Sequence, residues 1–103
     1  MKKSIVPEDF QLYFSDWHFS PIIEADGTVY LSGVTATRKD KLIRLHPEEQ
    51  FHDEFYKPGV YLKAAGLNYE NILEMTTFHI DIKKHAGIFS KVKDEYVKAP
   101  YPA

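Results

Sequence analysis

The pattern of hydrophobic and polar residues predicts a β-hairpin in the first third of the chain. Residues 20–25 and 28–34 form strands and flank Asp26-Gly27. This dipeptide favours the two-residue hairpin turn, because both of its positions tolerate a positive φ. Gly33, inside the second strand, suggests a bulge or a close backbone approach. Residues 6–19 are rich in aromatic side chains without a clean period, so we expect an irregular arm with short extended pieces.

Two helices are predicted after the hairpin. The first covers residues 47–65, with Pro47 in its first turn, Gly66 as its C-cap, and a kink where Pro58-Gly59 interrupts it. Its apolar stripe is Phe51, Phe55, Leu62 and Ala65. The second helix covers about residues 83–98 and is capped by Asp81. Its predicted buried stripe is Ile88, Phe89, Val92 and Tyr96.

Between the helices, residues 72–82 read as a long central strand, because threonine and isoleucine favour β-structure. One face of this strand should meet the helices, and it consists of Glu74, Thr76, Phe78, Ile80 and Ile82. Thr77, His79 and Asp81 should then point away, towards solvent or another subunit. The order of elements predicts a single α+β domain over residues 1–103, with both helices on one face of the sheet. Its last strands are missing, so we expect a chain truncated at the C-terminus.

Composition narrows the function classes. The 103 residues include no cysteine, which excludes thiol nucleophiles and thiolate metal sites. Thirteen basic and fifteen acidic side chains give a net charge of −2, which argues against a general nucleic-acid or membrane partner. No segment has the length and apolar character of a signal peptide or a membrane span. We therefore expect a cytoplasmic protein.

Candidate chemistry is sparse when each residue is considered alone. Residues 35–46 form a basic connection, which is either a solvated loop or an anion clamp for a substrate carboxylate. His46 and His52 are six residues apart, as are His79 and His85, so neither pair has the spacing of a helical zinc motif, and we expect no metal. His79 and Asp81 are either an oriented imidazole pair or a polar surface pair.

Ser32 has no GxSxG context, so a serine hydrolase is not expected. Together with Gly33 it could offer a hydroxyl and exposed backbone groups to the wall of a pocket, although an ordinary strand serine fits the spacing equally well.

Taken together, the motifs of residues 19–103 resemble the reactive intermediate deaminase family, also called Rid or YjgF-type proteins and historically named L-PSP endoribonucleases. The matching pieces occur in family order and are Phe19-Ser20-Pro21, Val29 to Gly33, Glu48-Glu49-Gln50, Leu62 to Leu67, Met75 to Asp81 and Tyr101-Pro102-Ala103. The resemblance implies a chorismate-mutase-like α+β fold and a homotrimer with ligand clefts between subunits. It also implies cofactor-independent hydrolysis of enamines or imines, such as 2-aminoacrylate, to keto acids and ammonia.

The same resemblance assigns candidate substrate-binding residues, which are Phe19, Ser32, Gly33 and Phe89. Ser32 matches the pocket serine of the family. Phe19 stands where active members commonly have tyrosine, Phe89 stands at a frequent asparagine position, and Lys57-Pro58 replaces a common helical asparagine. The arginine that holds the substrate carboxylate in the family follows the Pro-Ala pair, which here is Pro102-Ala103. No catalytic residue is assigned.

Two other functions remain open at this point. One is a non-catalytic trimer that binds small carboxylates or a protein partner through the cleft between subunits. The other is ribonuclease activity, against which the near-neutral charge and the lack of a catalytic histidine pair argue.

Overall fold

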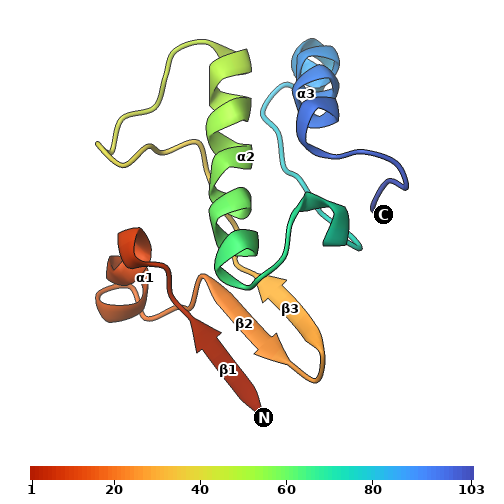
Figure 1. The fold of residues 1–103 in the computed structure, drawn as a ribbon. Coiled ribbons are helices and arrows are strands. Elements are labelled where there is room, and N and C mark those ends of the chain that lie inside the picture. The colour runs from red at the N-terminus through yellow and green to blue at the C-terminus, as the bar shows by residue number, and fades with distance from the viewer.

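The hairpin predicted from Asp26-Gly27 is present. In the computed structural model, which describes residues 1–103, β2 (Ile22–Ala25) and β3 (Thr28–Leu31) pair antiparallel. Asp26 and Gly27 both have positive φ, at 52° and 79°, as this turn requires. A third strand, β1 (Lys2–Ile5), was not predicted. It pairs antiparallel with the other edge of β2 and gives the sheet order β1-β2-β3 (Figure 1).

The aromatic arm is helical and not extended, which corrects the prediction. It contains η1 (Glu8–Phe10) and α1 (Gln11–Ser15). Pro7 lies directly before η1, and the acidic Glu8 and Asp9 fill the first turn, where they meet the positive end of the helix dipole.

The first predicted helix is present as α2 (Pro47–Ala64). It continues through Pro58-Gly59 as one helix, so these two residues do not end it (Figure 1). Gly66 has a φ of 77° and ends the helix as predicted. Its N–H donates to Lys63 O at 3.0 Å, and the N–H of Leu67 donates to Leu62 O at 2.7 Å. This pair of bonds is the Schellman motif, which satisfies carbonyls left open at the helix end.

Two different sides of α2 are buried. On one side, Phe51 and Phe55 pack in a core with Phe89 and Val92 of α3 (Ile82–Tyr96) and with Val97. On another, Tyr61 is fully buried and its ring centroid lies 5.1 Å from that of Phe10 in the arm. The helix therefore lies between α3 and the arm, and its last turns lie over the sheet (Figure 1). Ile88, predicted to be in the buried stripe of α3, is exposed.

Residues 72–80 do not form the predicted central strand. After the short helix η2 (Tyr69–Asn71), the chain runs to α3 without regular structure. Only its first residues make ladder-like bonds: Ala103 N–H donates to Leu73 O at 2.9 Å, and Met75 N–H donates to Ala103 O at 2.8 Å. This is the pattern with which a parallel ladder begins. No hydrogen bond between backbone groups joins residues 76–80 to another segment. Without a paired neighbour the segment is not a strand.

The predicted faces of this segment are also reversed. Phe78 and Ile80, expected against the helices, are each 92% exposed. Met75 packs against the core instead, and the ring centroid of His79 lies 4.5 Å from that of Phe89. Alternation fixes which residues share a face but not which face is buried, and the larger apolar residues misled the assignment.

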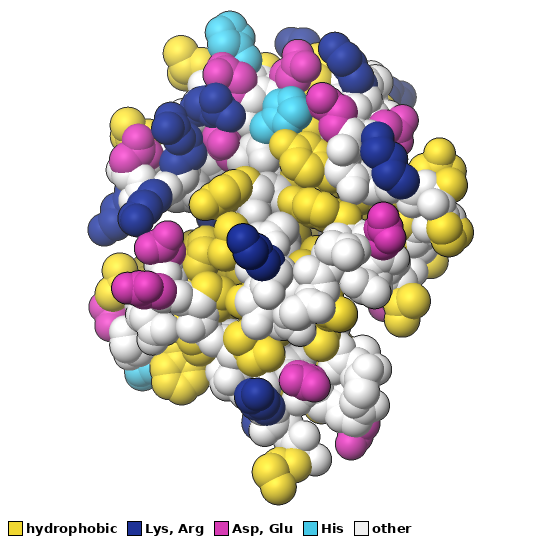
Figure 2. All heavy atoms as spheres, in the orientation of Figure 1, with side chains coloured by type: hydrophobic (Ala, Val, Ile, Leu, Met, Phe, Trp, Pro, Cys, Tyr) yellow, Lys and Arg dark blue, Asp and Glu magenta, His cyan; other side chains and the backbone are white.

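An apolar stripe is therefore open to solvent along this segment. It consists of Phe78, Ile80 and Ile82. Leu73, which alternation places on the opposite face, is exposed as well. Figure 2 shows hydrophobic side chains exposed across the middle of one face of the molecule, with charged side chains of both signs around them. Contiguous exposed apolar residues are typical of surfaces that contact other protein. None of the helices combines the length and the hydrophobicity needed to cross a membrane.

Candidate functional site

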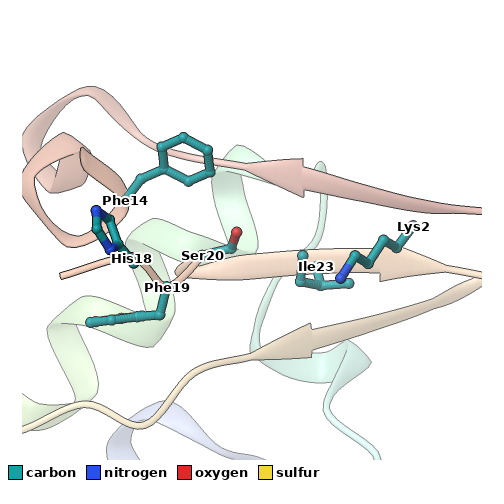
Figure 3. Close-up of a pocket in the computed structure, with 6 residues that line it drawn as sticks. All are labelled: Lys2, Phe14, His18, Phe19, Ser20 and Ile23. Carbon is teal, nitrogen blue, oxygen red and sulfur yellow. The ribbon is translucent and has the colours of Figure 1, made fainter. Parts of the chain in front are cut away.

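Phe19 lines an open cavity of about 470 Å³ on the sheet side of the arm. Six side chains from β1, the arm, β2 and the link between the arm and β2 surround it, and Figure 3 shows all of them: Lys2, Phe14, His18, Phe19, Ser20 and Ile23. In this view the two phenyl rings and His18 gather at one end of β2, and the Lys2 side chain lies beside Ile23 at the other. The lining thus has an aromatic end and a cationic end, and it contains no acidic residue.

Local contacts hold the aromatic end in place. His18 has a φ of 58°, in the left-handed region, and this turns the chain back after α1. The N–H of Phe19 then donates to Tyr13 O at 3.0 Å, and the two rings stack with their centroids 4.9 Å apart. The hydroxyls of Ser4 and Ser20, 2.7 Å apart, tie β1 to the residues before β2.

Ser32 lies just after β3, opposite Pro21, which directly follows the cavity residue Ser20. Its N–H donates to Pro21 O at 2.9 Å, which extends the hairpin ladder by one bond. Its Oγ is enclosed and has no hydrogen-bond partner among the groups of the protein. An unpaired buried hydroxyl costs about 1–3 kcal/mol, so such a group points to a ligand or a water molecule as its partner.

Tyr61 is the polar neighbour of Ser32 on α2, and the sequence reasoning missed it. Burial raises the pKa of its phenol to about 12, and Tyr13 acts in the same direction. The Ser32 hydroxyl lowers this pKa slightly, which places it near the phenol, although the two groups do not reach hydrogen-bond geometry. Tyr61 therefore keeps its proton at neutral pH. Its burial could not be read from the predicted stripe, because it lies on the second buried side of α2.

The other two candidate residues, Gly33 and Phe89, do not line this cavity. Gly33 is exposed, and no atom lies within 4 Å of the position that a Cβ would take, so the predicted close backbone approach is absent. Phe89 is buried in the core between α2 and α3. The structure thus places Ser32 opposite Pro21, two residues after Phe19, and places Phe89 among the core residues.

The basic connection is held to α2 by Arg44, which weakens the anion-clamp interpretation. Its Nε and Nη2 donate to the two oxygens of Asp53, both at 2.9 Å, and its Nη1 donates to Glu49 at 3.0 Å. The hydrogen bond with Asp53 raises the pKa of Arg44 most, and burial opposes it. With two carboxylates bound, Arg44 acts as an anchor for the loop. Arg38 lines a separate cavity of about 340 Å³ with only Lys39 and Asp40.

The histidines are dispersed. His52, on α2, has its Nδ1 2.6 Å from Tyr96 Oη and its Nε2 3.5 Å from a Glu95 oxygen, so it links α2 to α3. His79 packs on Phe89, and its Nε2 lies 3.0 Å from Thr77 Oγ1, so the prediction that it faces away from the helices is wrong. No group of three or more histidine or acidic side chains is placed to hold a metal ion.

Comparisons with known proteins agree on one family. Residues 14–103 match the family model described as endoribonuclease L-PSP. The RutC family protein YjgH of Escherichia coli (strain K12) is 24% identical over 102 residues, which are 98% of this chain and 78% of that protein. A solved structure of protein YJGH from structural genomics matches with a TM-score of 0.86 at 23% identity and covers 99% of this chain and 79% of that one. At this identity the structural match shows the fold.

Proposed function

This chain belongs to the endoribonuclease L-PSP family, and from that premise we propose that it is a cofactor-independent imine and enamine deaminase of a divergent branch. The substrate class is a reactive 2-imino acid or its 2-amino enamine form. An enamine such as 2-aminoacrylate first takes a proton on carbon and becomes the imine. Water then adds to the imine carbon, the carbon–nitrogen bond breaks, and a 2-keto acid and ammonia leave.

The enclosed hydroxyl of Ser32 carries this proposal. A water molecule that attacks an imine needs a nearby group to orient it, and a serine hydroxyl can both accept and donate a hydrogen bond. Ser32 Oγ has no such bond within the protein. The protonated phenol of Tyr61, close by, carries no charge. An uncharged water molecule or imine nitrogen therefore fits beside Ser32 better than an anion does.

We expect the Ser32→Ala variant to lose about tenfold or more of the deaminase rate, because one hydrogen bond to the reacting water is worth about that factor. The assay generates 2-aminoacrylate in situ and follows keto-acid release against a buffer blank. Ser90→Ala, an exposed serine on α3, is the matched control and should keep the full rate. If the unmodified protein gives no acceleration over the blank, the deaminase proposal is refuted.

Two features favour the second candidate function, a non-catalytic member that binds small carboxylates or a protein partner. Phe19 lacks the hydroxyl that active relatives commonly carry, and Arg44 is already bound to Asp53 and Glu49.

In either case we propose a homotrimer with ligand clefts between subunits. The exposed apolar stripe supports it, because a second copy of the chain would remove Phe78 and Ile80 from water. Sedimentation velocity should give the mass of three chains, and a monomer over a wide concentration range would contradict it.

A further inference from the structure

We propose that the cavity beside Phe14 and Phe19 binds an aromatic carboxylate. The ring of the ligand packs against the two phenyl groups, and its carboxylate is held at the Lys2 end. This deepens the second candidate function, binding of small carboxylates, and rests on it, since it names the ligand class for a cavity that includes Phe19 but not Ser32. Binding here does not require that any deamination takes place.

The aromatic end offers apolar area that the protein itself leaves uncovered. Phe14 is 50% exposed and Phe19 is 38% exposed, although both lie in the lining. Phe19 is held in one orientation by its stack on Tyr13, so the wall is formed before a ligand arrives. Aromatic pairs are most favourable in offset or edge-to-face contact, and a phenyl ligand could make either with these rings.

The other end supplies an uncompensated positive charge. The Lys2 ammonium has no carboxylate within 4.0 Å, in contrast to Lys39, which pairs with Asp9, and Lys91, which pairs with Glu48. His18 lies at the aromatic end, between the phenyl rings in Figure 3, and it also has no acidic partner. An anion entering this cavity therefore meets the Lys2 ammonium at one end and no acidic side chain in the lining.

The volume agrees with a ligand of this size. A cavity of about 470 Å³ lies within the usual range of small-molecule sites, about 300–1,000 Å³, and such sites combine apolar walls with a few polar groups. Because the aromatic and cationic ends lie at different points along β2 (Figure 3), the ligand needs a spacer between its ring and its carboxylate.

The test uses three probes in titration calorimetry: 3-phenylpropionate, propionate and 3-phenylpropanol. If the cavity binds both the ring and the carboxylate of the ligand, 3-phenylpropionate should bind at least about tenfold more tightly than either partial probe. Equal binding of propionate would remove the aromatic part of the proposal, equal binding of the alcohol would remove the carboxylate part, and no binding of 3-phenylpropionate would overturn it entirely.

Variants locate the site. Phe14→Ala and Lys2→Gln should each weaken 3-phenylpropionate binding about fivefold or more. Leu12→Ala, an exposed apolar residue of α1 outside the lining, and Lys3→Gln, the neighbour of Lys2 on β1, are the matched controls and should leave affinity unchanged. Circular dichroism checks that each variant is folded. Binding that survives both lining variants would place the ligand elsewhere. Ser32→Ala should lower the deaminase rate about tenfold or more without affecting this binding, so failure of one proposal is distinguishable from failure of the other.

Discussion

Replacing Phe55 with alanine is expected to lower the free energy of unfolding by about 3–5 kcal/mol. The ring is 4% exposed and lies near the centre of the contact between α2 and α3. It stacks on Tyr96 with an interplanar angle of 7° and lies 5.8 Å from Phe89. Truncation would remove these contacts and leave a cavity that two helices cannot easily close. Since a domain of this size is stable by about 5–15 kcal/mol, we expect a large unfolded fraction at moderate temperature.

Urea denaturation followed by circular dichroism measures this effect. Tyr56→Ala is the matched control, because Tyr56 is the next residue on the same helix, also aromatic, and 62% exposed. It should change the stability by no more than about 0.5 kcal/mol. Equal midpoints for the two variants would mean that the core does not lie between α2 and α3.

Replacing Gly59 with alanine is expected to destabilise the protein by about 1–3 kcal/mol, as overpacking does. The same change in an open helix usually stabilises it by about 1 kcal/mol. Here the added methyl group would overlap the Tyr69 hydroxyl and lie 3.0 Å from Tyr69 Cζ. That hydroxyl donates to Phe55 O at 2.6 Å. The methyl group can be accommodated only if the Tyr69 ring moves, which breaks this bond and disturbs the core.

A double-mutant cycle separates the clash from the intrinsic preference of the helix. In the Tyr69→Phe background, Gly59→Ala should cost less, because the nearest atom has been removed, although the contact with Cζ remains. Gly87→Ala in α3 serves as the control. No atom lies within 4 Å of its added Cβ, so it should stabilise by up to about 1 kcal/mol. A Gly59→Ala protein that gains as much thermal stability as Gly87→Ala would show that Tyr69 does not fill this position.

Elements whose signals are local could be predicted from the sequence. Asp26-Gly27 determines its own turn, and Pro47 and Gly66 mark the ends of α2. The prediction of a strand at residues 72–82 failed, because strand structure depends on a paired neighbour as well as on the residues themselves. Within residues 1–103 only Ala103 pairs with this segment. The choice of the buried face depended on the helices above it, and Leu73, on the same alternate face as Met75 and His79, is 81% exposed.

The residues of the candidate site also differ in whether they carry a local sequence signal or meet only through the fold. Ser32 and Phe19 were found through the family motifs, and the structure places Ser32 opposite Pro21, two residues after Phe19. Lys2 and His18 carry no motif and meet only because β1 pairs with β2 and the arm turns back at His18. Tyr61 was missed because one apolar stripe was assumed for a helix that is buried on two sides.

Because α2 lies between α3 and the arm, the side chains of the arm can vary separately from those of the core between α2 and α3. The contacts of Phe51 and Phe55 with α3 lie on one side of the helix, and Phe10 of the arm packs against Tyr61 on the other. Residues 6–19 can therefore exchange the side chains that line the cavity while the aromatic core stays intact. Selection acting on the arm could change which molecules the protein recognises without a matching penalty in folding, so relatives with the same helices need not share a ligand.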